Sequence, residues 1–298
     1  MPGQLAGPTE YGGFGVRLIA AMAARGPLCA GIDPHPALLR DWGLADDPAG
    51  LERFALTAVE ALAPEVAVVK PQSAFFERHG ARGIAVLERV LAGARVAGAL
   101  VLLDVKRADI GSTMAGYAEA YLSEGAPLAA DAITVSPYLG VGALEPAFDL
   151  AGRAGRGVFV LALTSNPEGA EVQAALTSTG ATVAQSVVDA VAARNVGRRP
   201  VGDFGVVIGA TTPPGALRLD ALGGPVLAPG LGTQGATLAD LHQVFGGAVG
   251  QVLPATSRDL LRHGPESVTL RRAARRMADD AAAGLVRPSW QVGGGTPR

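Results

Sequence analysis

The sequence predicts a (β/α)8 TIM barrel that spans residues 1–298 as a single domain, with one extra helix near each end. Eight short apolar runs have the continuity of strands that are buried on both faces, as in a parallel sheet. Nearly every run is followed by a helix candidate, and eight such units in about 250 residues is the usual size of this barrel. The competing architecture is an open doubly wound sheet, but no G-x-G-x-x-G segment follows the first strand.

The predicted elements alternate along the chain. The expected strands are residues 28–32, 66–69, 99–105, 132–135, 157–163, 204–208, 225–228 and 251–254. The expected helices are residues 14–24, 50–62, 80–96, 116–123, 142–151, 181–195, 214–222, 238–245 and 266–284. The first of these helices precedes the barrel strands, and the last one, which is rich in arginine, follows them.

Composition limits the classes of protein to which this chain can belong. A hydrophobic content of 49% supports a large core, and a net charge of −2 argues against a general surface for nucleic acid. Cys29 is the only cysteine, so no intrachain disulfide can form, and we expect it to pack as a small apolar residue. We expect no membrane span, no signal peptide and a cytoplasmic location, because no long apolar run and no leader pattern is present. Residues 1–12 and 291–298 are expected to be flexible.

The chemistry is expected to centre on residues 102–113, LLDVKRADIGST. An apolar strand leads directly into Asp104 and Lys106, and Asp109 follows beyond the predicted end of the strand. Side chains two apart on a strand share a face, so Asp104 and Lys106 should project together. Buried charges are costly unless they are paired, so this pattern is typical of a charged pocket rather than of a core.

Lysine is rare in this chain, and both of its lysines follow predicted strands. Lys70 and Lys106 are the only lysines among the 25 Lys and Arg residues. Lysine can give up its proton, whereas arginine stays charged. Barrel enzymes build their active sites at the C-terminal ends of the strands. Chance placement of two structural lysines is the alternative, but the coincidence with two strand ends favours a role in chemistry.

Further polar residues follow the other strands. They are Asp33, Gln72, Ser136, Ser165, Gln234 and Arg258. The Gly-rich residues 229–235 follow the seventh strand and precede a helix, where backbone N–H groups can bind an anion. Barrels frequently bind phosphate with the loops after strands seven and eight, and arginine fits phosphate geometry. The sequence therefore predicts a phosphate site, although single polar residues at strand ends are also common as turn formers and helix caps.

No metal or cofactor site is expected. The four histidines are scattered and lack the spacing of zinc ligands. Asp33, Asp104 and Asp109 have oxygen atoms of the kind that binds Mg²⁺, but the two lysines would compete with the cation. The residues instead indicate a phosphorylated small molecule above a carboxylate–lysine array. In such an array a lysine can protonate a carbanion while carboxylates destabilise a substrate carboxylate.

The ordered motifs resemble those of the orotidine 5′-monophosphate decarboxylase family. D-x-K-x-x-D is present as Asp104, Lys106 and Asp109, and its continuation resembles the longer bacterial subgroup of mycobacteria and other actinobacteria. The resemblance covers most of the chain, because the following segments occur in the family's order: GIDPHP, VVKPQSAFFE, LLDVKRADIGST, TVSPYLG, LALTSNP, PGLGTQG and ATSRDLL. It implies a homodimeric barrel that converts orotidine 5′-monophosphate to UMP and CO₂ without a cofactor, the last step of de novo UMP synthesis.

The resemblance also implies catalytic roles. Lys106 would protonate C6 of the carbanion, and Asp104 would lie near the departing carboxylate. Lys70 and Asp109 would complete the alternating charge network. Asp109, Ile110 and Thr113 would reach into the site of the neighbouring subunit.

The implied contacts to the substrate come from several strand ends. Asp33 would bind ribose hydroxyls, and Ser165 or Thr164 would contact the pyrimidine. Gln234 and Arg258 would bind the phosphate. Pro137, with Tyr138, either lines the pyrimidine pocket or only shapes its turn.

Two other functions fit parts of the pattern. Metal-dependent sugar-phosphate decarboxylases and aldolases of the same superfamily share D-x-K after the third strand, but they need an acidic ligand where this chain has Lys70. A barrel that only binds a nucleotide or phosphate is the other possibility. The complete Asp and Lys array argues against it, because phosphate binding alone needs no flanking carboxylates.

Overall fold

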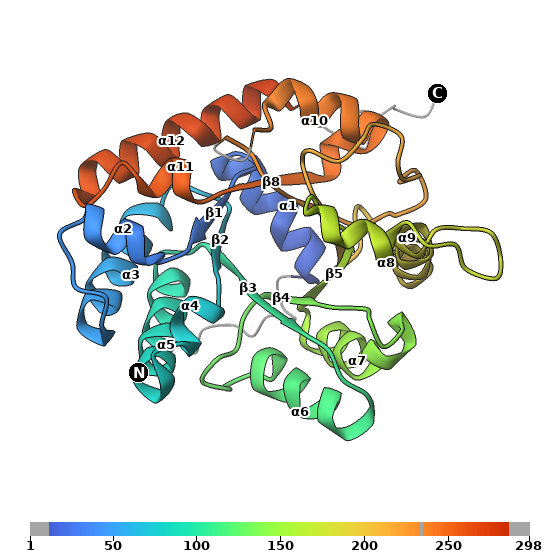
Figure 1. Cartoon of the computed structure of the whole chain (residues 1–298), viewed down its shortest axis with the longest axis horizontal. Helices are drawn as coiled ribbons and strands as arrows, with labels where there is room; N and C mark the ends of the chain where they lie inside the picture. The colour runs from blue at the N-terminus through green and yellow to red at the C-terminus, as the bar shows by residue number, and fades with distance from the viewer. Residues whose placement is uncertain (1–11, 233–234, 286–298) are drawn as a thin grey trace, which may run out of the picture.

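The computed structural model of the chain describes residues 12–232 and 235–285. Most of the two terminal segments for which we expected flexibility, residues 1–11 and 291–298, lie outside this range. Eight parallel strands close into a barrel in the order β1 to β8, and β8 pairs with β1 (Figure 1). The predicted (β/α)8 TIM barrel is therefore confirmed.

The observed elements follow the predicted alternation. The strands are β1 (Cys29–Ile32), β2 (Val68–Pro71), β3 (Leu100–Arg107), β4 (Ala132–Val135), β5 (Gly157–Leu163), β6 (Phe204–Ile208), β7 (Val226–Pro229) and β8 (Val252–Thr256). The longer helices are α1 (Phe14–Arg25), α3 (Pro48–Leu62), α5 (Gly80–Val96), α6 (Gly111–Leu122), α7 (Glu145–Ala154), α9 (Val183–Asn195), α10 (Leu238–Phe245) and α12 (Ser267–Gly284). The short helices are α2 (Pro36–Asp41), α4 (Ala74–Glu77), α8 (Ala170–Gln173) and α11 (Arg258–Leu261).

Two hydrophobic clusters hold the barrel together, one outside the strands and one inside. Along β5, Val158 and Val160 pack in the outer cluster with the surrounding helices, whereas Phe159 packs in the inner cluster. This alternation follows from the two-residue period of a strand. Because both faces are covered, the strands consist of the continuous apolar runs that predicted them.

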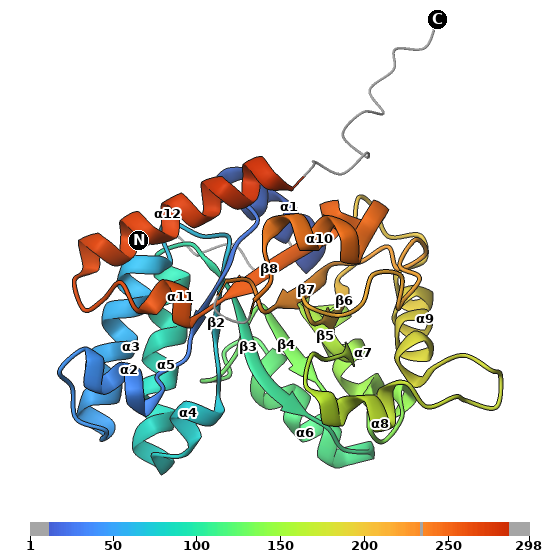
Figure 2. The ribbon, with the colours of Figure 1, turned by 45° about the horizontal axis from the view of Figure 1, so that its top comes forward.

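Helix α1 closes the N-terminal end of the barrel. Its Phe14 belongs to the inner cluster and meets Phe159 edge to face, with ring centroids 5.9 Å apart. A Cβ on Gly157, the first residue of β5, would lie 2.5 Å from the Phe14 ring, so only glycine permits this approach. Figure 2 shows α1 at one end of the barrel and α4 and α8 at the other. The C-terminal strand ends therefore form the face that remains for chemistry.

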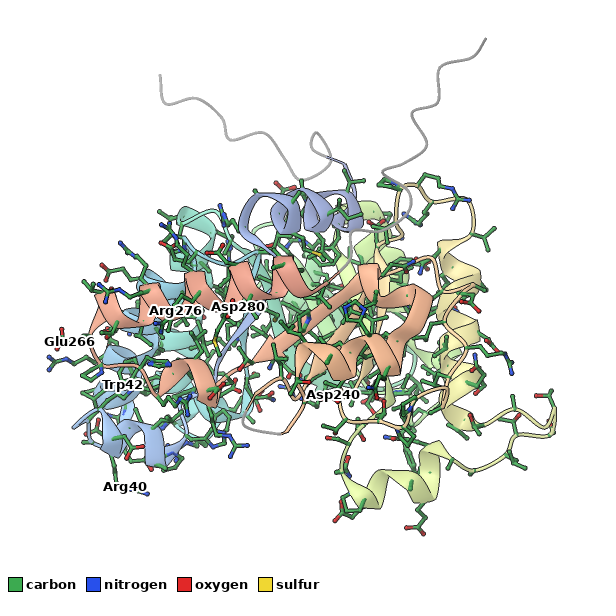
Figure 3. The ribbon with its side chains drawn as sticks, turned by 90° about the horizontal axis from the view of Figure 1, so that it is seen from above. Arg40, Trp42, Asp240, Glu266, Arg276 and Asp280 are labelled. Carbon is green, nitrogen blue, oxygen red and sulfur yellow. The ribbon has the colours of Figure 1, made fainter. Side chains whose placement is uncertain are left out.

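The last helix, α12, packs against α1, α3 and α10. Leu270 and Ala274 are buried on its inner side, whereas Glu266 at its N-terminal cap and Arg276 and Asp280 along its length are visible in Figure 3. Glu65 pairs with Arg275 of this helix at 2.8 Å. None of the helices in residues 12–232 and 235–285 combines the length and apolarity needed to cross a bilayer.

Two predicted helices differ most from those observed. Residues 214–222 form turns instead of a helix, because Pro213, Pro214 and Gly215 interrupt regular hydrogen bonding and Gly215 has a φ of +73°. The apolar pattern there arises from loop side chains, such as Leu222, that reach the core. Helix α6 begins at Gly111, five residues before the predicted start at 116.

Candidate active site

The C-terminal half of β3 departs from regular strand geometry at the residues of the D-x-K motif. Leu103 pairs with Ile133 and Arg107 with Val135, so β3 carries a bulge between these two positions. Within the bulge Lys106 has a φ of +47°, in the left-handed region that residues other than glycine rarely adopt. The bulge brings the Lys106 ammonium onto Asp104, so these two side chains meet as predicted, although through an irregular backbone.

Asp104 is the centre of a buried charge network. Its Oδ2 accepts a hydrogen bond from Lys70 Nζ at 2.9 Å, and its Oδ1 accepts one from Lys106 Nζ at 2.6 Å. The side chains of Lys70 and Asp104 are 8% and 9% exposed, whereas that of Lys106 is 45% exposed. One lysine is therefore locked beneath the carboxylate, and the other stands at the surface of the site.

The network fixes the ionisation of Lys70 and Asp104. Burial alone would lower the pKa of Lys70, but the carboxylates of Asp104 and Asp33 outweigh burial and raise this pKa above its usual range. Burial likewise works against a charged Asp104, but the neighbouring Lys70 and Lys106 hold the pKa of this carboxyl well below its usual range. The carboxylate is thus ionised at any physiological pH.

Two further side chains support the network, and sequence reasoning missed the role of both. Thr134 of β4 donates a hydrogen bond to Asp104 Oδ1 at 2.7 Å, and its hydroxyl accepts one from the backbone N–H of Lys106 at 3.0 Å. Gln72 accepts a bond from Lys106 Nζ at 3.3 Å through its Oε1. The only signal for Thr134 was a polar residue inside the apolar strand Ala132–Val135.

A cleft of about 270 Å³ opens beside this network, between the C-terminal ends of β1, β7 and β8. Its polar lining includes Asp33, His35, Lys70, Thr256, Ser257 and Arg258. Three of its oxygen atoms, Asp33 Oδ1, Thr256 Oγ1 and Ser257 Oγ, are buried yet have no hydrogen-bond partner in the described part of the chain. Buried polar atoms are usually hydrogen-bonded, so this cleft has the character of a ligand site.

The structure brings three of the predicted site residues to this cleft, namely Asp33, Lys70 and Arg258. Lys70 belongs to both the cleft and the charge network, so it joins the two. Gln234, our second candidate for the phosphate site, lies outside the described residues. Gly230 and Leu231 of the Gly-rich loop do line the cleft.

The residues that close the D-x-K-x-x-D motif lie apart from the network. Asp109 Oδ1 accepts a hydrogen bond from the N–H of Ile110 at 2.8 Å, and among the described residues no ion pair includes Asp109. Ile110 is 62% exposed, and Thr113 lies exposed in the first turn of α6. Within one chain, therefore, Ile110 and Thr113 face solvent, and Asp109 is half-buried.

The candidate pyrimidine contacts lie on the turns after β4 and β5. The backbone N–H of Thr164 donates to Gln173 Oε1 at 2.9 Å, and its hydroxyl donates to Asn166 Oδ1 at 2.6 Å. Ser165 beside it is exposed. Pro137 is half-buried after β4, and Tyr138 is 79% exposed.

The remaining polar groups near the barrel interior do not form a metal site. Within residues 12–232 and 235–285, no three His, Cys, Asp or Glu side chains are grouped as metal ligands. Both oxygens of Asp104 are already occupied by lysine ammonium groups. Burial raises the pKa of Cys29 to about 12, so this thiol stays neutral and packs as a small apolar group.

Known proteins are similar to this chain in sequence and structure over most of its length. Residues 26–273 match the model of the orotidine 5′-phosphate decarboxylase / HUMPS family. Orotidine 5′-phosphate decarboxylase of Salinispora arenicola is 62% identical over 272 residues, which is 91% of this chain and 98% of that protein. The enzyme of the same name from Streptomyces coelicolor is 60% identical over 267 residues, covering 89% of this chain and 95% of that protein.

The solved structures agree with the sequence relatives. A Streptomyces avermitilis chain, crystallised as a candidate orotidine 5′-phosphate decarboxylase, superposes with a TM-score of 0.91 at 57% identity, covering 95% of this chain and 99% of that chain. Orotidine 5′-monophosphate decarboxylase of Methanocaldococcus jannaschii, in complex with the inhibitor BMP, has the same fold, with a TM-score of 0.58 at 18% identity, over 85% of this chain and 96% of that chain. On the sequence match over residues 26–273 and these close relatives, the chain belongs to the orotidine 5′-phosphate decarboxylase / HUMPS family.

Proposed function

We propose that this chain is an orotidine 5′-monophosphate decarboxylase, a cytoplasmic carboxy-lyase that forms UMP and CO₂ in the last step of de novo UMP synthesis. The observation that carries the proposal is the position of ionised Asp104 between a buried and an exposed lysine, beside a cleft that holds Asp33 and Arg258. The relatives that are 60–62% identical and bear this enzyme's name support it.

The proposed reaction breaks the bond between C6 of the pyrimidine and its carboxylate. The electron pair of that bond stays on C6 as CO₂ leaves, and an N–H of the Lys106 ammonium delivers its proton to C6. Lys106 then recovers a proton from solvent, which its 45% exposure permits. No electron acceptor is needed, because the proton neutralises the carbanion.

Asp104 acts in this proposal by raising the energy of the bound substrate. A carboxylate that lysines keep ionised repels the substrate carboxylate, and loss of CO₂ removes that repulsion. Lys70 holds Asp104 in place and ionised, since it is buried and bonded to the oxygen that Lys106 does not use. Asp104 and Lys70 would thus favour the transition state over the bound substrate.

The rest of the substrate is assigned to the neighbouring strand ends. Asp33 would accept hydrogen bonds from ribose hydroxyls, and Arg258 with Gln234 would bind the phosphate. For the pyrimidine we favour Ser165 over Thr164, because the backbone N–H and hydroxyl of Thr164 are already engaged by neighbouring side chains. Pro137 would form an apolar edge of the same pocket.

We also infer that the active enzyme is a homodimer with shared sites. Three large apolar side chains at the ends of the neighbouring strands β3 and β4 are exposed, since Ile110, Tyr138 and Leu139 are 62%, 79% and 51% exposed. Covering them with a second copy would bury that surface and bring Asp109 and Thr113 of each chain towards its partner's site. An Asp109 carboxylate that has no ion pair within the described part of its own chain fits this arrangement.

The experiment that tests the proposal is the ultraviolet absorbance of orotidine 5′-monophosphate incubated with the purified protein in excess EDTA. We expect the orotate chromophore to disappear with stoichiometric formation of UMP. Unchanged absorbance with retained UMP binding would replace the proposal by a binding-only barrel. Turnover of sugar phosphates that depends on added Mg²⁺, without turnover of the nucleotide, would replace it by the metal-dependent branch of the superfamily.

A further inference from the structure

His35 lines the ligand cleft but has no part in the function proposed above. It follows β1 in the segment Asp33-Pro34-His35-Pro36 and shares the cleft with Asp33, Lys70 and Arg258. Its side chain is half-buried. A histidine at this position can donate a hydrogen bond in its neutral form and carry a charge in its protonated form.

The backbone holds this residue in place without help from the ring. Proline fixes its own φ and biases the residue before it towards an extended conformation, and His35 between two prolines has φ −61° and ψ 143°. Its N–H donates to the carbonyl oxygen of Asp33 at 2.8 Å. Although His35 is the N-cap residue of α2, its side chain makes no capping hydrogen bond.

The ring of His35 has one aromatic contact, which is apolar. It packs against Phe75 with ring centroids 4.2 Å apart and an interplanar angle of 62°. Neither ring nitrogen has a hydrogen-bond partner among residues 12–232 and 235–285. The side chain therefore occupies a rigid position at the cleft with its polar atoms unused.

Burial and the charges that face His35 together lower its pKa below the usual value. Burial is the largest effect and lowers its pKa, and the guanidinium groups of Arg258 and Arg78 lower it further. The carboxylate of Asp33 opposes them. The other charged residues that line the cleft are Lys70 and Asp259. A dianionic group placed next to Arg258 would offset the guanidinium charges and favour the imidazolium form.

We propose that His35 is a further substrate-binding residue, whose ring donates a hydrogen bond to the 5′-phosphate opposite Arg258 and takes up a proton as the nucleotide binds. This inference rests on the proposed function, because it assumes a nucleotide in the cleft. We assign the phosphate rather than the ribose as the partner of the His35 ring. The ribose hydroxyls are donors, and the unpartnered acceptor Asp33 Oδ1 matches them. The His35 ring N–H is a donor beside Arg258 and therefore matches an anion.

The test is calorimetric titration of UMP into the wild-type protein and three variants between pH 6.0 and 8.5. Repeating each titration in buffers of different ionisation enthalpy gives the number of protons taken up on binding. His35→Asn and His35→Gln remove the titrating ring, and His35→Phe keeps packing on Phe75 without any N–H. The phosphate of UMP titrates near pH 6 in every case, so differences between proteins isolate His35.

We expect the wild type to take up more protons than all three variants at pH 6.5, and its affinity to exceed that of His35→Phe by about tenfold at pH 6.0. His35→Gln should recover much of the affinity at pH 8.5, where the wild-type ring is neutral, but not at pH 6.0. Equal proton uptake in wild type and His35→Gln, or an affinity loss that does not vary with pH, would overturn the proposal.

Arg258→Ala separates this inference from the proposed function. If the wild type binds UMP and Arg258→Ala weakens binding while the His35 variants do not, only the role of His35 is wrong. If the wild type does not bind UMP at all, the proposed function fails and the role of His35 fails with it.

Discussion

The two sides of the C-terminal barrel face are built on opposite principles. On the β2–β4 side, both carboxylate oxygens of Asp104 are bonded to lysines, and Thr134 and Gln72 satisfy much of what remains. On the β8–β1 side, Asp33, Thr256 and Ser257 keep buried oxygens without partners. The first side is organised before any ligand arrives, as an electrostatic catalyst should be. The second side leaves its hydrogen bonds to be completed by a ligand.

The largest effect that we expect lies on the organised side. Lys106→Ala should lower kcat by about 10³-fold or more, because it removes the proton donor, while UMP binding changes only a few-fold. Lys106→Arg is the matched control, since it keeps the charge but does not release a proton. Absorbance assays and calorimetric titration of UMP give the two readouts. Near-normal turnover in Lys106→Ala would contradict the assignment of catalysis to the organised side.

The second prediction asks whether the organised side is complete within one chain. Lys106→Ala and Asp109→Ala homodimers should each be inactive, whereas heterodimers of the two should regain up to about half of the wild-type activity, because each closed two-fold heterodimer then holds one intact site of two. A randomly exchanged equal mixture, in which about half of the dimers are heterodimers, should reach about a quarter. The control is a mixture of Lys106→Ala with Asp104→Ala, whose residues belong to the same site of one chain. Verified heterodimers without recovered activity would show that Asp109 does not cross the interface.

The third prediction concerns stability. Lys70→Met should lower the free energy of unfolding by about 3 kcal/mol, because it leaves Asp104 buried with its inner oxygen unpaired. The double variant Lys70→Met with Asp104→Leu should recover most of that loss while remaining inactive. Chemical denaturation compares them, and Arg275→Ala should cost less than about 1 kcal/mol, because the Arg275 side chain is 70% exposed and Glu65 keeps its pair with Arg271 at 3.6 Å.

The wild type and the double variant should also differ in how their free energy of unfolding depends on acidic pH. The pKa of Asp104 is lower in the folded protein, so its stabilisation is present above the ordinary carboxyl value of about 4 and is lost as pH falls towards the folded value. The double variant lacks this term. Its free energy of unfolding should therefore decline less steeply between about pH 4 and pH 2 than that of the wild type, and parallel curves would contradict the assignment.

The smallest expected effect concerns the contribution of the Thr134 hydroxyl to the organised side. Thr134→Val should lower the free energy of unfolding by about 1–2 kcal/mol and reduce kcat by about tenfold, since it removes a donor to Asp104 and an acceptor for the Lys106 backbone. Thr134→Ser keeps the hydroxyl and should stay close to wild type in both. If valine and serine behave alike, the hydroxyl does not position the network.

The two sides also differ in how far the sequence predicts them. Asp104 and Lys106 are close in sequence, and strand periodicity predicts that they meet, although the observed contact is made through the β3 bulge. Strand ends predict that Lys70 joins them, because parallel strands bring their C-terminal ends to one face. Thr134 could not be predicted in this way, since a threonine inside a strand is usually a packing residue and its role depends on the β3 bulge. The fold was easier to predict than the site, because each of the eight buried strands is a run of apolar residues in the sequence.

The two incorrect helix predictions also have local causes. Residues 214–222 looked like a helix because loop residues such as Leu219 and Leu222 are buried as deeply as those of a helix face. Periodicity reports burial, and burial does not require regular hydrogen bonding. The early start of α6 at Gly111 was missed because the preceding residues carry the motif, whose polar character hid the first turn.

At position 106 the backbone conformation and the side-chain chemistry favour different residues. A φ of +47° is comfortable for glycine and costs other residues about 1 kcal/mol. Backbone conformation alone would therefore favour glycine there, whereas the proposed proton transfer requires lysine. A search for thermostable variants guided by stability alone would therefore tend to replace the residue that we propose as the proton donor.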